Sequence, residues 1–284
     1  MLSTWDKRSD SVMTFVVWGS AALVAAILFA LLGDLVWHGA RQLSWDFLFS
    51  APESAGRAGG IAPIMVSTGL ILVVALAAVV PLGLATAILL SEFAPGDSSL
   101  ARGTNFSLDI LAGVPSIVFG LFGNAFFCVY LGMGFSILSG GRTLACMILP
   151  IFIRAATAGL SSVPEDWRRG ALALGLSRQA ALRHLLLPGA APALGVGLIL
   201  GCGRALAETA ALVFTSGYVD RMPSSLSDSG RALAVHIYDL SMNVTGGDKN
   251  AYATSLVLIM LLIVINSTSS WVMEKFLHRR IVYS

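Results

Sequence analysis

The chain has 284 residues, of which 56% are hydrophobic and 12% charged, with a formal net charge of +2. Because soluble domains are about one quarter charged, this composition excludes an ordinary soluble protein, and the small net charge gives no reason to expect nucleic-acid binding. The histidines are scattered and no CxxC motif occurs, so neither a metal site nor a disulfide is expected. Three cysteines in apolar runs are expected to pack as small hydrophobic residues: Cys128, Cys146 and Cys202.

Apolar segments long enough to cross a bilayer, which takes about 20 helical residues, recur along the chain. Lys7 and Arg8 precede the first segment, but this run is longer than a signal-peptide core and has no convincing cleavage site, so we expect it to be retained. The sequence therefore predicts an all-α polytopic membrane protein with six transmembrane helices. Their predicted bounds are residues 12–33, 63–90, 108–135, 143–162, 192–215 and 251–273.

The basic residues determine the predicted orientation. They prefer the cytoplasmic side of a membrane, and more of them lie there when both termini are cytoplasmic. This orientation leaves two long external segments, 34–62 and 216–250, which their Gly, Pro and Ser residues predict to be irregular connecting loops. The chain then divides into an N-terminal span with its external loop (1–62), a transmembrane core (63–273) and a cytoplasmic tail (274–284).

The cytoplasmic segment between the fourth and fifth spans, residues 163–192, reads VPEDWRRGALALGLSRQAALRHLLLPGAAP. Apolar and small residues recur at helical spacing, Gly175 suits a left-handed helix stop, Ser177 can cap a following helix and Pro188 can end it. These signals predict a helix–turn–helix at the membrane surface, although an amphipathic linker lying on anionic lipid fits them equally well. Four arginines are predicted to point outward: Arg168, Arg169, Arg178 and Arg183.

The fifth predicted span contains two charged residues. Arg204 and Glu208 are four residues apart and are expected to pair on one helical face. Gly197 and Gly201 continue this face as a surface for close helix packing. Charges within a membrane normally face a protein interior or a water-filled cavity, so the pair either joins helices or lines a path. Arg154 adds a cation near the inner end of the fourth span, and two cations against one carboxylate predict a positive excess suited to an oxyanion.

Residues 169–188 resemble the cytoplasmic loop of ABC-importer permeases, which reads Glu-Ala-Ala, three residues, Gly, nine residues and Ile-x-Leu-Pro. The spacing is the same here, with Arg169 in place of the Glu and Gly170 in place of the first Ala. In that family the loop fits a cleft on the ATPase subunit and transmits its closure. The resemblance therefore implies ATPase coupling for Arg169, Gly170, Ala171, Gly175, Leu187 and Pro188.

Three further motifs resemble the PstA and PstC permeases of bacterial phosphate-specific importers. AGVPSIVFG at 112–120, LPIFIR at 149–154 and GRALAETA at 203–210 are similar to the AGxPS, LPxxIR and GRAxGET motifs of that family. The resemblance implies a PstA-type permease subunit with the type I ABC importer fold, in the inner membrane. It also implies that three charged residues take part in phosphate movement: Arg154, Arg204 and Glu208.

No lysine of the chain completes the Gly-Lys-Ser/Thr motif of an ATP-binding loop, and no set of catalytic residues is apparent. We therefore expect a subunit that is not an enzyme and holds no cofactor, with ATP and Mg²⁺ bound by a separate ATPase. The resemblance implies a complex with a second, PstC-like permease, two ATPase subunits and a soluble phosphate-binding protein, assembled in the lipid bilayer.

The sequence leaves three alternatives open. The first is an ABC permease for a phosphonate or another oxyanion, such as sulfate or molybdate, because arginines alone do not separate these anions. The second is an ion-coupled secondary transporter, which predicts an internal repeat and paired broken helices, and no convincing repeat is evident. The third is a membrane enzyme or an assembly subunit, in which Arg204 and Glu208 would be a structural pair only.

Overall fold

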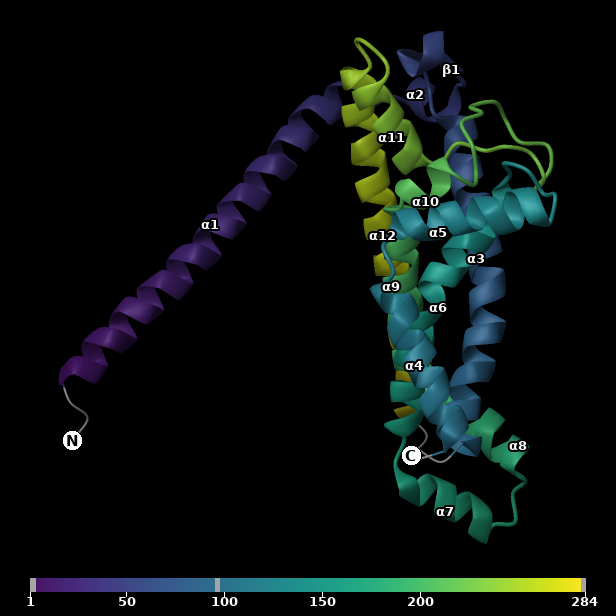
Figure 1. The fold of residues 1–284 in the computed structure, drawn as a ribbon. Coiled ribbons are helices and arrows are strands. Elements are labelled where there is room, and N and C mark those ends of the chain that lie inside the picture. The colour runs from purple at the N-terminus through teal and green to yellow at the C-terminus, as the bar shows by residue number, and fades with distance from the viewer. Residues whose placement is uncertain (1–3, 95–97, 282–284) are drawn as a thin grey trace.

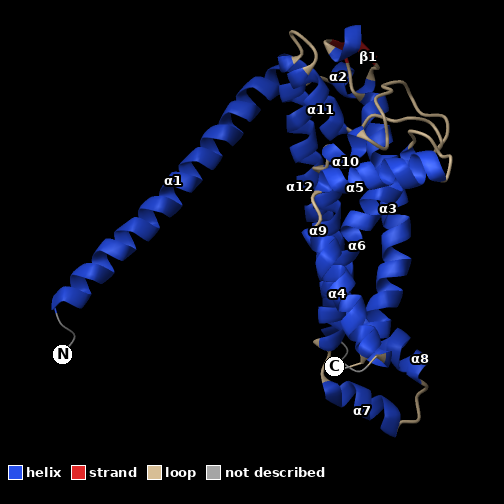
Figure 2. Ribbon diagram, in the orientation of Figure 1, coloured by secondary structure: helices blue, strands red, loops and turns tan. Residues whose placement is uncertain are grey.

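The computed structural model describes residues 4–94 and 98–281. Figure 1 and Figure 2 show an elongated, mainly helical bundle with one long helix, α1, leaning away from it. Within the described residues, five helices are long and apolar enough to cross a membrane, and a bent helix pair makes a sixth if it is counted as one span. This agrees with the six predicted spans. The first, second, fourth and sixth lie on α1, α3, α6 and α12.

The elements follow one another along the chain with short connections. The long and medium helices are α1 (Thr4–Gln42), α3 (Ala62–Ile88), α4 (Ser99–Gly113), α5 (Ser116–Gly123), α6 (Ile137–Ser161), α7 (Glu165–Ala173), α9 (Leu187–Leu206), α11 (Leu233–Met242) and α12 (Asp248–Ile281). Short helices are α2 (Trp45–Phe49), α8 (Arg178–Ala181) and α10 (Ala210–Val213). The remaining elements are the π-helical turns η2 (Leu89–Phe93), η3 (Asn124–Tyr130) and η4 (Leu182–Leu186), the 3-10 turn η1 (Ser54–Gly56), and an antiparallel hairpin of β1 (Pro52–Glu53) and β2 (Ala58–Gly59).

Helix α6 forms the centre of the bundle and packs against both α3 and α9. Ile71, Leu144, Ile148 and Phe152 are almost fully buried in the middle of this core. Glycine allows the helices to approach closely, since a Cβ added at Gly83 of α3 would lie only 2.5 Å from the Phe152 ring. The core therefore fixes α6 relative to its two neighbours.

The predicted glycine surface of the fifth span is also present. A Cβ added at Gly197 would lie 2.8 Å from Cβ of Ala155, and one at Gly201 would lie 2.5 Å from Cγ2 of Ile148. Real Cβ atoms do not come so close to their neighbours, so a larger residue at either position would push α9 away from α6.

Helix α1 is attached to the bundle at one end only. Its residues 10–34 are exposed, whereas its last turns pack against α12. There the Tyr252 hydroxyl donates a hydrogen bond to Asp34 at 3.1 Å, and Gly39 lies against Leu256. Because this apolar helix is left uncovered by the chain, it must face lipid or a partner chain in the membrane.

The third predicted span, 108–135, is wrong as a continuous helix. Helix α4 ends at Gly113, α5 begins at Ser116, and the two are bent by 102°. Pro115 has no N–H and restricts the residue before it to extended backbone, which Val114 adopts with φ −73° and ψ 129°. The AGVPS motif is therefore a corner, from which α5 runs across the bundle (Figure 1).

The fifth predicted span, 192–215, is wrong at both ends. One helix runs from Arg178 through η4 to Leu206. The prediction that Pro188 ends a helix is also wrong, because the helix continues from the π-helical turn η4 through Pro188 into α9. At the other end the chain leaves the helix after Leu206 and starts the short α10 at Ala210.

The two segments predicted to be external are more ordered than the sequence predicted. Residues 34–62 contain α2 and the β1–β2 hairpin, and residues 216–250 contain α11, which packs against α12. Leu233, Val235 and Leu240 of α11 are almost fully buried. A helix of 10 residues between polar loops gives too short an apolar pattern to be recognised from periodicity.

Candidate functional site

The structure places Arg204 and Glu208 beside each other, although not on one helix. Arg204 lies in the last turn of α9, and Glu208 lies in the break that follows Leu206. The prediction of one shared helical face is therefore wrong. The predicted ion pair nevertheless forms, with Nη2 of Arg204 3.3 Å from Oε2 of Glu208.

The two side chains of this pair have very different surroundings. The Glu208 side chain is 4% exposed and the Arg204 side chain is 47% exposed. Oε1 of Glu208 also accepts a hydrogen bond from the Ala211 N–H at 3.2 Å, at the start of α10. The carboxylate is thus held on two sides, while most of the five donors of the guanidinium remain available to another acceptor.

The second predicted cation, Arg154, has a partner that the sequence did not reveal. Its Nη2 contacts Oδ1 of Asp109 on α4, and the two side chains are 52% and 64% exposed. The predicted positive excess is therefore wrong for these two sites, because each arginine has its own carboxylate. Asp109 and Arg154 are 45 positions apart in sequence, and they meet only because α4 packs beside α6.

The two ion pairs lie at different depths in the bundle. Gly197 of α9 packs against Ala155, the neighbour of Arg154, and Arg204 is seven residues farther along α9. With a rise of 1.5 Å per residue, this separation corresponds to about 10 Å along the helix axis. Arg154 lies seven residues before the end of α6, from which the chain enters α7, whereas Arg204 lies in the last turn of α9, far from the end that follows α8. Arg154 is therefore nearer to the α7–α8 end of the bundle.

The predicted helix–turn–helix of residues 163–192 is present as α7 and α8. Gly175 adopts the left-handed conformation, with φ +71°, and Oγ of Ser177 accepts a hydrogen bond from the Ala180 N–H at 3.2 Å. These two local predictions are confirmed. The second helix, however, continues through η4 into α9 instead of ending.

The six residues expected to contact an ATPase do not form one surface. Arg169, Gly170 and Gly175 are exposed, and a Cβ added at either glycine would have open space around it. Ala171 is buried against the bundle, and Leu187 and Pro188 lie partly buried at the start of α9. Four large apolar residues of α7 and its following turn are exposed, and we call them the α7 apolar patch: Trp167, Leu172, Leu174 and Leu176.

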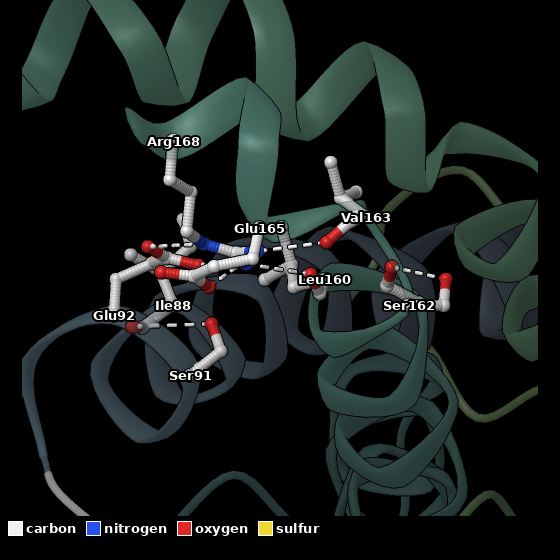
Figure 3. Close-up of polar contacts among 9 residues, drawn as sticks. Ile88, Ser91, Glu92, Leu160, Ser162, Val163, Glu165 and Arg168 are labelled. Atoms are coloured by element: carbon white, nitrogen blue, oxygen red, sulfur yellow. Dashed lines mark hydrogen bonds and ion pairs between the residues drawn. The ribbon is translucent and has the colours of Figure 1, made fainter. Parts of the chain in front are cut away.

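The prediction that Arg168 points outward is wrong. Figure 3 shows its guanidinium directed into the bundle, toward Glu92 of η2. Nη2 lies 2.7 Å from Oε1 of Glu92, and the two side chains are only 20% and 17% exposed. The hydrogen bond with Glu92 raises the pKa of the Arg168 guanidinium above its usual range. By sequence alone, Arg168 could not be distinguished from its exposed neighbour Arg169.

A second ion pair with two largely buried side chains lies at the end of the bundle opposite α7 and α8. Arg231 and Asp239 approach to 3.2 Å, with side chains 10% and 16% exposed. Arg231 also donates to the Tyr218 carbonyl at 2.8 Å, and it lies 3.3 Å from Nδ1 of His236. Burial, with a smaller effect of Arg231, lowers the pKa of His236 to about 4. No sequence motif pointed to this cluster.

Among the described residues, no group of three or more His, Cys, Asp or Glu side chains could hold a metal ion. All three cysteines are free, with Cys128 and Cys202 buried and Cys146 partly buried.

Comparison with known proteins identifies the family. Residues 79–282 match the family described as binding-protein-dependent transport system inner membrane component. The chain belongs to this family. It is thus a multi-pass inner-membrane permease, and members of such importers work with ATPase subunits and binding proteins.

The relatives of this permease agree with that assignment. It is 30% identical over 283 residues to a probable ABC transporter permease protein, YqgI, of Bacillus subtilis, covering 93% of this chain and 95% of the relative. It is 32% identical over 211 residues to the phosphate transport system permease protein PstA 2 of Mycobacterium bovis, covering 74% and 68%. These likenesses confirm the resemblance to PstA-type permeases.

A solved structure shows the same fold. A chain of a bacterial ABC transporter involved in the import of the acidic polysaccharide alginate superimposes with a TM-score of 0.61 at 13% identity. The match covers 95% of this permease and 99% of that chain. The type I ABC importer fold that the sequence predicted is confirmed.

Proposed function

We propose that this permease forms the anion path of an ATP-driven phosphate importer and that a separate ATPase drives it. The observation that carries the proposal is Arg204, a guanidinium within a membrane-spanning helix that stays half exposed while buried Glu208 holds it. Charge at such a position is costly unless it faces a cavity or a path. The likeness to PstA 2 supports phosphate as the anion.

Arg204 would bind the passing anion through its planar donor fork, which matches two phosphate oxygens. The Ala211 N–H fixes Glu208, and Glu208 in turn fixes the guanidinium, so no reorganisation is needed when the anion arrives. Because the carboxylate neutralises much of the cation's charge, phosphate is held weakly enough to leave again, which a conducting path requires.

Arg154 and Asp109 would form a second station, nearer to the α7–α8 end. Both side chains are more than half exposed, so a phosphate oxygen can replace Asp109 at the guanidinium without stranding a buried carboxylate. The anion would then move between two cations that are about 10 Å apart along the helix axis.

The proposal also covers the other parts of the complex. In this proposal both termini and the α7–α8 end are cytoplasmic, and the α7 apolar patch, with Arg169, Gly170 and Gly175 beside it, contacts the ATPase. That ATPase binds ATP and Mg²⁺, and this permease is not itself an enzyme. A second, PstC-like permease closes the exposed side of Arg154 and Arg204, and a soluble phosphate-binding protein delivers the anion at the opposite end.

Uptake of radiolabelled phosphate tests this proposal, in cells that lack the permease and in the same cells with it restored. Excess unlabelled arsenate, sulfate, molybdate or a phosphonate is added as competitor. We expect restored, ATP-dependent uptake that arsenate alone reduces.

A phosphonate or another oxyanion is the alternative within the same class, since the name of the YqgI relative specifies no substrate. Restored uptake of labelled sulfate or phosphonate, but not of phosphate, would keep the importer and refute its phosphate specificity. If no anion were taken up in a nucleotide-dependent manner, the proposal would fail as a whole.

A further inference from the structure

Helix α7 has little apolar packing to hold it against the bundle. Of its nine residues, Ala171 is the buried one. Behind the helix lies a hollow of about 220 Å³, bordered by Phe93, Leu172 and Leu182 among others. Dispersion contacts are lost across such a gap, so another contact must hold α7 in register with the membrane helices.

Arg168 supplies that contact by joining three segments at once (Figure 3). Its Nη2 donates to Oε1 of Glu92 at 2.7 Å and to the Leu160 carbonyl at 2.8 Å, and its Nη1 donates to the Val163 carbonyl at 2.8 Å. Nε lies 3.4 Å from Oε2 of Glu92. The guanidinium therefore ties α7 to the end of α3 and to the end of α6.

We call the contacts of Arg168 with Glu92, Leu160 and Val163 the joint, and their chemistry favours strong hydrogen bonds. The Leu160 carbonyl also accepts a hydrogen bond from the Val163 N–H at 3.4 Å, and carbonyls at a helix C-terminus carry partial negative charge, which a cation stabilises. Glu92 adds a charge-assisted bond at a partly buried site. Glu165 stands farther off, 4.0 Å from Nη1, and is exposed. Glu92 itself belongs to the π-helical turn η2, and such turns are frequent at functional sites.

We propose that Arg168 is a positioning residue that transmits movement of α7 to the ends of α3 and α6. When the ATPase closes on α7, the rigid guanidinium bridge moves Glu92 and the η2 turn with it, and α3 passes the displacement to the anion path through its packing on α6. This proposal rests on the proposed function, because it requires a separate ATPase bound at α7.

The test uses the whole importer, purified with its ATPase subunits and reconstituted in proteoliposomes. Phosphate uptake and ATP hydrolysis are both measured for wild type, Arg168→Gln, Glu92→Gln, Arg168→Lys and the charge-swapped double variant Arg168→Glu/Glu92→Arg. The matched control is Arg102→Gln, which removes the same charge from an exposed position of α4.

Arg168→Gln and Glu92→Gln should each lower the phosphate transported per ATP hydrolysed by about tenfold, while ATP hydrolysis and subunit assembly persist, because coupling is weakened rather than docking. Arg168→Lys should have a smaller effect, since a lysine keeps the charge but cannot bridge the carboxylate and two carbonyls. The double variant should recover part of the loss, and Arg102→Gln should behave as wild type.

Wild-type coupling in both single variants would overturn the proposal. So would loss of the ATPase subunits from all joint variants, Arg168→Lys included, because it would show a static role in docking. A wild-type importer that transports no anion would instead refute the proposed function. If it transports a different oxyanion, the same coupling ratio is measured with that substrate, and the two proposals are judged separately.

Discussion

Four ion pairs of this permease differ in exposure between the ends of the bundle and the membrane-spanning helices. At the ends, Arg168–Glu92 and Arg231–Asp239 are closed pairs, in which both side chains are largely buried. Within the spans, Arg154–Asp109 and Arg204–Glu208 are open pairs, whose guanidinium groups are about half exposed. Both groups consist of an arginine and a carboxylate. Exposure therefore decides whether the hydrogen-bond donors of the guanidinium are occupied by the protein or remain available to a ligand.

This comparison makes a clear physical distinction. Removing one partner of a closed pair strongly destabilises the protein, because the other partner is left buried and unpaired. The open pair Arg154–Asp109 contributes little to stability, since both of its side chains are exposed. In both open pairs the half-exposed guanidinium can bind an anion. Closed pairs should therefore affect folding or coupling, and open pairs should mainly affect transport.

The largest expected loss of stability is at Arg231. Arg231→Met should lower the free energy of unfolding by about 4 kcal/mol, because Asp239 and the Tyr218 carbonyl lose their buried partner. Unfolding by SDS in mixed micelles measures the change, with Arg221→Gln, at an exposed position of the same loop, as the control. Equal stability of the two variants would show that the Arg231–Asp239 pair does not stabilise the fold.

The same cluster should make stability depend on pH. His236 has a folded pKa of about 4, below the ordinary value of about 6.5, so the unfolded chain binds the proton more tightly and acid favours unfolding. Stability should be full above pH 6.5 and should fall by up to about 3 kcal/mol as the pH is lowered to 4. His236→Gln should flatten this part of the unfolding profile, whereas His184→Gln, at an exposed position, should leave it unchanged.

The spacing of the two open pairs depends on the contact between α6 and α9. Gly201→Leu should cost about 2 kcal/mol by overpacking, because its Cβ would already lie 2.5 Å from Ile148. The matched control is Gly203→Ala, since a Cβ there meets nothing within 4 Å and alanine favours a helix. SDS unfolding and uptake should both be impaired in the first variant and intact in the second. Normal uptake by Gly201→Leu would show that the spacing is unimportant.

The smallest expected effect on stability is at Asp109. Asp109→Asn should change the free energy of unfolding by less than about 1 kcal/mol, because the pair is exposed. It should slow phosphate transport and tighten phosphate binding, since Arg154 would no longer have a carboxylate that competes with the anion. Steady-state uptake kinetics separate these effects: we expect a lower maximal rate together with a lower half-saturating concentration. Unchanged kinetics would exclude Asp109 from the path.

The sequence was most informative where one local segment determines the structure. Continuous apolar residues indicate where the spans lie, so five helices and their order could be anticipated, although the ends of the fifth could not. Gly175 and Ser177 act on their own turn, and both were predicted correctly. The bend at Pro115 was missed because hydropathy continues through it, although the residues that cause the bend are adjacent.

The sequence was least informative about partners. Glu92 and Arg168 are 76 positions apart, and Asp109 and Arg154 are 45 apart, so each contact exists only after helices have packed. Arg168 and Arg169 are adjacent and chemically identical, and only the fold turns one inward. The candidate cations could therefore be identified from the sequence, whereas the carboxylates that pair with them could not all be identified.

The central claim is that the half-exposed guanidinium of Arg204 binds the anion as it passes through the permease. ATP-dependent uptake of radiolabelled phosphate by the reconstituted importer tests it most directly, with Arg204→Gln compared with wild type and with Arg142→Gln, at an exposed position outside the two open pairs. Loss of uptake in Arg204→Gln alone is predicted, with the complex assembled and ATP still hydrolysed. Uptake by Arg204→Gln at the wild-type rate would contradict the account.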